Sequence, residues 1–309
     1  MPHGPEKILP GFYFFRRGYL NANHFAYRSE RPILIDTGYL GDWKVTESLL
    51  SGLGLNLDDT ALIINTHTHC DHVGGNHRIQ ERSDCGIALH PRGFRFMREF
   101  DDRAPWWTFY HQEAEFFQPT EVLEDGRTVK VGPYAFKVIH TPGHASDGLV
   151  LYCRSERLLL SSDTLWEYDF PVMTLAVEGE KAIETMLISL DKIAGLDVDR
   201  VFPGHGAPFD DFGDALERAG TRLKRLQADP LLVGWDLVKK IIVYTIMMKG
   251  RVPVATFFED LMKTNWYPDT VARYFPGDHN RIYEATIQDF HQRHIIRRDG
   301  RYWVTTVER

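Results

Sequence analysis

The feature that most constrains the fold is a run of metal-binding side chains placed directly after an apolar segment. Residues 61–65 read ALIIN, the pattern of a buried strand, and residues 66–76 read THTHCDHVGGN. In a chain leaving a strand, alternate residues point to one side, so His67 and His69 can share one metal ion. The chain then turns, which lets Asp71 and His72 face a second one. Imidazole and carboxylate donors suit zinc, and also iron or manganese.

Three more donors follow, and each lies where a predicted strand ends. His144 closes the segment HTPGH, Asp163 lies in SSDTL, and His205 lies in PGHG. A Pro-Gly pair alone only indicates a turn. The order of these donors along the chain, together with the dense run before them, predicts a two-metal site at one edge of a sheet.

The periodicity of apolar residues predicts an α/β protein. Short β-rich runs cover residues 32–38, 61–65, 86–90, 135–139, 149–152 and 157–161, with helical patterns at 42–51, 75–82 and 180–193. From about residue 214 amphipathic helices dominate, at 215–227, 233–248, 255–263 and 281–292. Residues 294–304 form a predicted hairpin around Asp299-Gly300. We therefore predict a catalytic domain over residues 1–212 and a small, mostly helical, winged-helix-like domain over residues 213–309.

The donor pattern resembles that of the metallo-β-lactamase superfamily, in which an HxHxDH loop precedes a distal His, a bridging Asp and a final His. The resemblance covers about residues 8–210. It implies an αββα four-layer sandwich with two divalent metal ions, most simply zinc, at one edge of the sheets. By resemblance, the first metal is held by His67, His69 and His144, the second by Asp71, His72 and His205, and Asp163 bridges them.

Two aspartates have further roles under this resemblance. Two metals about 3.5–4 Å apart lower the pKa of a bridging water, so that hydroxide is available near neutral pH. Asp71 would accept a hydrogen bond from that hydroxide and pass its proton to the leaving group. Asp36, in the segment IDTG, corresponds to the aspartate that orients a ligand histidine from behind. An ordinary turn-forming aspartate is the alternative at that position.

Aromatic residues are concentrated where a substrate pocket is expected. Residues 94–117 form an aromatic-rich stretch that we interpret as an irregular insertion, and WEYDF follows Asp163 closely. The candidate pocket residues are Trp106, Trp107, Tyr110, Trp166 and Tyr168. A satellite core or a homodimer surface would use the same residue types, so both alternatives stay open.

We expect a small-molecule substrate, and the overall charge does not indicate nucleic acid or membrane as a partner. The 309 residues carry a formal net charge of -7, which provides no general attraction for nucleic acid or membrane. Residues 213–309 hold 16 Lys and Arg against 12 Asp and Glu, a modest excess that disfavours nucleic acid as a partner but leaves it open. Three cysteines without paired spacing, no signal peptide and no long apolar run predict a cytoplasmic location.

The leading functional hypothesis is hydrolysis of a small ester, thioester or lactone by a hydroxide that bridges two metals. Lactonases of this superfamily carry tyrosine three residues after the bridging aspartate, whereas this chain has Trp166. A phosphodiesterase or ribonuclease is the first alternative. A mononuclear iron enzyme of the persulfide dioxygenase type is the second, and a non-catalytic sensor is the third.

Overall fold

The first sheet of the protein combines an antiparallel half with a parallel half. The computed structural model describes residues 4–308. Seven strands run in the order of the sequence, antiparallel from β1 to β4 and parallel from β4 to β7. They are β1 (Glu6–Leu9), β2 (Phe12–Phe15), β3 (His24–Tyr27), β4 (Ile33–Ile35), β5 (Leu62–Ile64), β6 (Gly86–Leu89) and β7 (Glu121–Val122).

The second sheet has five strands in the order β12-β11-β10-β9-β8. Only the β11–β12 pair is parallel. The strands are β8 (Thr128–Val131), β9 (Tyr134–His140), β10 (Leu149–Cys153), β11 (Leu158–Ser162) and β12 (Arg200–Pro203). In β8 and the first half of β9, buried and exposed residues alternate, as expected for strands with one face toward a core.

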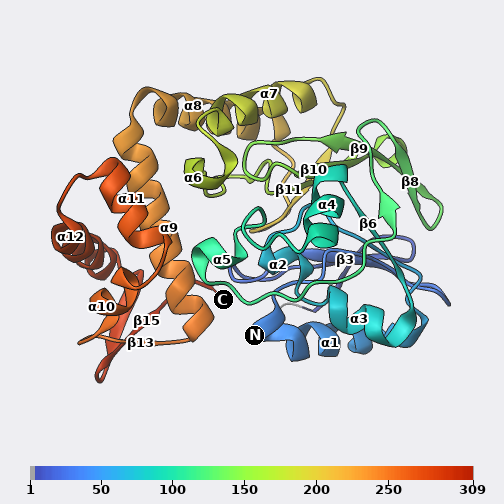
Figure 1. Cartoon of the computed structure of the whole chain (residues 1–309). Coiled ribbons are helices and arrows are strands. Elements are labelled where there is room, and N and C mark those ends of the chain that lie inside the picture. The colour runs from blue at the N-terminus through green and yellow to red at the C-terminus, as the bar shows by residue number, and fades with distance from the viewer. Residues whose placement is uncertain (1–3, 309) are drawn as a thin grey trace.

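The two sheets bury a shared core and carry helices on their outer faces, which confirms the predicted αββα sandwich. Phe14 and Phe25 of the first sheet meet Phe202 of the second, with ring centroids 5.2 and 6.0 Å away. Figure 1 shows α1 and α3 on one outer side and α7 and α8 on the other. The helices up to residue 194 are α1 (Trp43–Gly52), α2 (Cys70–Val73), α3 (Asn76–Ser83), α4 (Pro91–Glu99), α5 (Trp107–Tyr110), α6 (Leu175–Glu178) and α7 (Ala182–Ala194), with 3-10 turns at Leu40–Asp42, Leu57–Asp59 and Arg154–Glu156.

The last third of the chain is built around one long helix, α9 (Pro230–Lys249). Asp229 accepts a hydrogen bond from the backbone N–H of Leu231 at 3.0 Å, and Pro230 takes the first helical position, a favourable start for a helix. The helix ends at Gly250, whose φ is +71°. Around it lie α8 (Phe212–Ala228), α10 (Phe257–Met262), α11 (Trp266–Tyr274), α12 (His279–Gln292) and a small sheet of β13 (Val252–Pro253), β14 (Ile296–Asp299) and β15 (Tyr302–Thr305).

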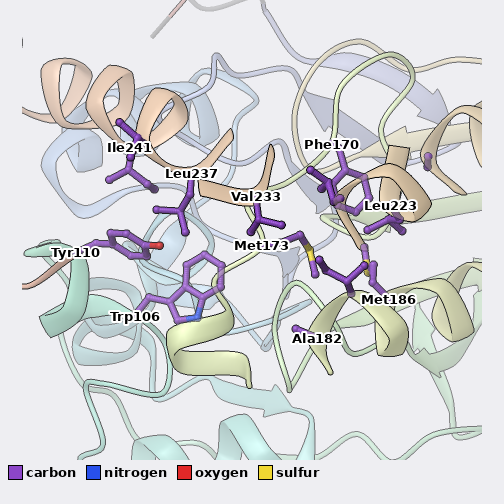
Figure 2. Packing of buried hydrophobic residues seen from close by; sticks show 14 of the residues in the cluster. Trp106, Tyr110, Phe170, Met173, Ala182, Met186, Leu223, Val233, Leu237 and Ile241 are labelled. Atoms are coloured by element: carbon purple, nitrogen blue, oxygen red, sulfur yellow. The ribbon is translucent and has the colours of Figure 1, made fainter. Parts of the chain in front are cut away.

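The predicted terminal hairpin is confirmed, since Asp299 pairs with Tyr302 across a turn that contains Gly300 at a φ of +59°. The helix α11 was not predicted. The predicted domain boundary after residue 212 falls at the start of α8 and stays a prediction. One buried cluster joins side chains of α7, α8 and α9, among them Met186, Leu223 and Leu237 (Figure 2). Within residues 4–308, none of the helices combines the length and apolar character needed to cross a bilayer.

Candidate metal centre

The first group of donors lies at the carboxyl end of two neighbouring parallel strands. In the register of β4 and β5, Ile35 stands beside Ile64, so the residues that follow each strand emerge at the same sheet edge. Asp36 follows β4 with a φ of +56°. His67 and His69 follow β5, and α2 then turns the chain so that Asp71 and His72 face the same space. The side chains of this run of donors thus face one shared space instead of being spread along a strand.

The second group comes from the other sheet. His144 follows β9, Asp163 follows β11 and His205 follows β12. Gly204 allows a close approach here, because a Cβ at that position would lie 2.0 Å from Asp163 Oδ1. Asn23 donates hydrogen bonds of 2.9 Å to the carbonyls of Pro203 and Gly206, which hold the turn on both sides of His205.

The structure brings the seven sequence-predicted donors together in overlapping groups. Within each of three sets, the candidate donor atoms lie within 4.8 Å of one another; the sets are His67/His69/His144, His67/His72/Asp163 and Asp71/His72/His205. Each of the seven residues is at most 8% exposed. Asp163 stands between the groups: its Oδ2 is 3.3 Å from His144 Nε2, and its Oδ1 is 3.7 Å from His72 Nε2.

The hydrogen bonds behind the donors orient them toward this shared space. Asp36 Oδ2 accepts a bond from His72 Nδ1 at 2.8 Å and one from Thr66 Oγ1 at 2.7 Å. The carbonyl of Val172 accepts one from His144 Nδ1 at 2.7 Å. Because Nδ1 is the donor in both histidines, Nε2 is the atom left to bind a metal. Asp36 therefore lies behind His72, one of the candidate ligand histidines.

The donor set fits a divalent metal site on its own chemistry. Among the described residues, His72 Nε2, His144 Nε2 and Asp163 Oδ1 are buried without a hydrogen-bond partner. Buried polar atoms of this kind are costly unless something binds them. Imidazole and carboxylate donors at this density match zinc, iron or manganese.

Charge coupling within the cluster is strong. Burial opposes the charging of His72, but the carboxylates of Asp36, Asp71 and Asp163 outweigh it and raise its pKa well above the usual value. Burial also opposes ionisation of Asp163, yet His205 and His72 hold its pKa well below its ordinary range. A divalent cation that replaces a proton on His72 would be stabilised by the same carboxylates, so metal binding should release protons.

Trp106 covers one side of the cluster. Its ring lies 3.9 Å from that of His69 and 4.9 Å from that of His144, centroid to centroid. It adopts a φ of +71°, a conformation that costs energy in a bulky residue. Its indole N–H donates to Glu178 Oε1 at 2.8 Å. Burial, and to a lesser degree Asp147, raises the pKa of Glu178 to about 8.

The other predicted pocket residues take different places. Trp166 lies 5.1 Å from the His205 ring and lines a cavity beside it. Trp107 and Tyr110 are instead buried in packed cores, because helices α4 and α5 give order to the stretch that we expected to be irregular. Trp107 donates to the carbonyl of Thr68 at 3.0 Å. Tyr168 is 76% exposed beside Arg218.

Two neighbours of the cluster had no signal in the sequence. The ring of Tyr19 stacks parallel to that of His205 at 6.1 Å. The hydroxyl of Tyr244, on α9, lies 3.6 Å from Cys70 Sγ. Cys70 belongs to residues 66–76, the segment with four of the candidate donors, which we call the ligand loop. Both contacts join segments far apart in the chain, so no local pattern could have indicated them.

Two packed sheets with donors from both at one edge define a metal-binding protein of the metallo-β-lactamase fold. The family model described as "Metallo-beta-lactamase superfamily" matches residues 21–205, more than half of the chain. The chain belongs to this superfamily. Helices α8 to α12 and the last small sheet lie outside the matched region.

Known relatives agree with this assignment. A probable metallo-hydrolase of Methanocaldococcus jannaschii is 26% identical over 60% of this chain and 88% of its own length. Acyl-coenzyme A thioesterase MBLAC2 of Homo sapiens is 28% identical over 60% of this chain and 71% of its own. A hydroxyacylglutathione hydrolase of Francisella tularensis subsp. novicida is 25% identical over 62% and 66%.

The likeness to one solved structure also covers the last third of the chain. A metallo-beta-lactamase family protein from Thermus thermophilus superposes with a TM-score of 0.62 at 22% identity, covering 97% of this chain and all of the other. A metallo-beta-lactamase from Cronobacter sakazakii superposes with a TM-score of 0.58 at 19% identity and covers 74% of this chain. These likenesses show the fold alone.

Proposed function

We propose that this protein is a two-metal hydrolase that cleaves thioesters. The observation that carries the proposal is the convergence of seven buried donors into overlapping groups joined by Asp163. The relatives named as an acyl-coenzyme A thioesterase and a hydroxyacylglutathione hydrolase support a thioester over the ester and lactone alternatives.

We assign the candidate donors to two metal sites, for which zinc is the simplest choice. His67, His69 and His144 would hold one ion, and the Asp71, His72 and His205 group would hold the other. The carboxylate of Asp163 lies between the two groups: its Oδ1 is 3.7 Å from His72 Nε2, and its Oδ2 is 3.3 Å from His144 Nε2 and 3.8 Å from His205 Nε2. When bound, two divalent metals supply a deprotonated water near neutral pH and polarise the attacked carbonyl.

The chain itself would manage the protons of the reaction. Hydrolysis forms a C–O bond to the acyl carbon and breaks the C–S bond, so the thiolate must gain a proton from the attacking water. Asp71, whose Oδ2 lies 3.1 Å from His205 Nε2, is positioned among the donors and is the proposed proton carrier. Asp36 keeps His72 in the tautomer that leaves Nε2 free.

The test is a substrate panel on metal-loaded protein. We expect turnover of acyl thioesters, with lower rates on lactones and oxygen esters. Single-stranded RNA and a bis-aryl phosphate are the contrasting substrates. Activity only on these phosphodiesters would overturn the proposal in favour of a phosphodiesterase. One iron per chain together with oxygen consumption would instead favour the dioxygenase class.

A further inference from the structure

A cavity of about 550 Å³ lies between the sandwich and the C-terminal helices, beside the candidate metal centre. This volume lies in the range of ordinary ligand sites. Trp166 and Tyr19 line it, and both rings flank His205 at centroid distances of 5.1 and 6.1 Å. The cavity therefore adjoins the donors of the second metal group.

One face of α9 forms a wall of this cavity and changes character along its length. Lys239, Val243, Tyr244 and Met247 line the cavity at helical spacing. With a rise of 1.5 Å per residue, Lys239 and Met247 are about 12 Å apart along the axis. The charged end is thus separated from the apolar end by roughly the length of a short acyl chain. Tyr244 lies between the two ends, and its hydroxyl is next to the ligand loop at Cys70.

The charged end carries an excess of positive charge. Four cations line the cavity against two carboxylates. Arg222 and Lys240 are compensated, because both form ion pairs with Asp169 and with Asp236; the four distances lie between 2.5 and 3.2 Å.

The other two cations are compensated less. Among the ion pairs of residues 4–308, Lys239 and Arg293 both pair with the carboxylate of Asp289, at 2.8 and 3.6 Å. This pair keeps one positive charge in excess and lines the cavity. An anionic group of a bound ligand is the natural complement of such a pair.

We propose that this cavity binds an acyl thioester of an anionic thiol carrier, in a fixed direction along α9. The acyl chain lies toward Val243, Met247 and Val307, the carrier's negative groups lie toward Lys239 and Arg293, and the carbonyl faces the metal centre near Tyr244. This inference rests on the proposed thioester hydrolysis and adds its substrate class and orientation. Coenzyme A and glutathione are both anionic thiols, so the experiment must distinguish them.

The acyl end is tested with a chain-length series of thioesters on metal-loaded protein. Burial of each methylene should raise kcat/KM roughly fourfold until the cavity is filled. The variant Val307→Trp, which narrows the apolar end from a half-buried position, should lower kcat/KM for octanoyl relative to acetyl thioesters at least about tenfold. The matched control is Leu231→Trp on the exposed first turn of α9, which should leave the profile unchanged. An identical chain-length profile in Val307→Trp and wild type would overturn the acyl assignment.

The charged end is tested with three acetyl thioesters, those of coenzyme A, glutathione and neutral N-acetylcysteamine. In the double variant Lys239→Gln/Arg293→Gln, KM for the anionic substrates should rise up to about fivefold per cation removed, and the neutral substrate should be much less affected. In the wild type, higher salt should reduce the difference in KM between the anionic substrates and the neutral substrate. The anionic carrier whose KM rises in the double variant is the carrier that the two cations recognise. Lys249→Gln, an exposed lysine at the end of the same helix, is the control.

The outcomes separate this inference from the proposed function. If the wild type hydrolyses none of the thioesters, the proposed function fails and the cavity assignment fails with it. If it hydrolyses them all with equal KM, and the double variant does the same, the proposed function stands and the orientation along α9 is wrong.

Discussion

The exchange Asp36→Asn removes one oxygen and leaves the shape of the side chain intact. Asp36 is buried and accepts hydrogen bonds from His72 Nδ1 at 2.8 Å, Thr66 Oγ1 at 2.7 Å and the Thr66 backbone N–H at 2.9 Å. In asparagine, one of the two oxygens becomes an NH2 donor. If that NH2 group faces His72, it opposes a second donor, and the imidazole is driven to the tautomer with the proton on Nε2. That tautomer cannot bind a metal through Nε2.

The magnitude follows from the single contact that is lost. Removal of a carboxylate behind a ligand histidine typically costs 10- to 100-fold in metal affinity or activity, about 1.4–2.7 kcal/mol. We expect the affinity of the second metal to fall by this factor, while the first metal group, which does not contact Asp36, keeps its affinity. A competition titration with a zinc chelator, followed by the thioester assay at saturating zinc, measures both effects.

The matched control is Asp191→Asn, an exposed carboxylate on α7 that is not one of the candidate donors. It should bind both metals as the wild type does. Two unchanged zinc affinities in Asp36→Asn would refute the reasoning, because they would mean that the hydrogen bond to His72 does not select the tautomer. Equal loss at both sites would point to a general disturbance of the ligand loop instead.

Three further predictions concern stability. Burial raises the pKa of Glu178 to about 8, so between about pH 4.5 and 8 the folded chain holds a proton that the unfolded chain releases. The free energy of unfolding should therefore fall by about 2–4 kcal/mol as the pH rises through this range, and Glu178→Gln should remove this decrease in urea unfolding measured at several pH values. Gly143→Ala should lower the free energy of unfolding by about 2–4 kcal/mol in the same assay, because the φ of Gly143 is +141° and the new Cβ would lie 2.6 Å from Met186 Cα. The control Gly195→Ala has open space around the new Cβ and should change the free energy of unfolding by no more than about 0.5 kcal/mol. Removal of metal by a chelator should lower the unfolding temperature, because free zinc at 100 times its Kd stabilises the folded state by about 2.7 kcal/mol. An unfolding temperature that does not change with chelator would contradict a metal site in the folded state.

The donors could be predicted because each one follows a recognisable strand. His144 follows β9, Asp163 follows β11 and His205 follows β12, and the structure brings all three to the histidine run. Parallel pairing of β4 with β5 and of β11 with β12 places successive strand ends at the same edges. Local patterns were therefore enough to predict an α/β protein and the positions of the donors, whereas the αββα sandwich was predicted from the resemblance to the superfamily.

The aromatic neighbours could not be sorted in the same way. Trp106 and Trp107 are adjacent in the chain and equally buried, yet the ring of the first packs against His69 and that of the second against Phe116. The difference follows from the backbone conformation of Trp106, with a φ of +71°, and no side-chain pattern indicates it. The contact of Tyr244 with Cys70 joins residues 174 positions apart.

Helix α11 was missed for a local reason. It begins with Trp266, Tyr267 and Pro268, a composition that suggests a loop or an edge strand. Proline is tolerated in the first turn of a helix because the N–H groups there have no helical partner. Packing against α9 then supplies the stabilisation that the sequence composition lacks.

The most direct test of the central claim is the metal content of the purified protein, measured by mass spectrometry alongside the hydrolysis of an acyl thioester. We predict two divalent metal ions per chain, loss of turnover when either one is removed, and recovery when zinc is returned. A well-folded protein that carries no metal, or a single iron with consumption of oxygen and no thioester cleavage, would contradict the two-metal hydrolase.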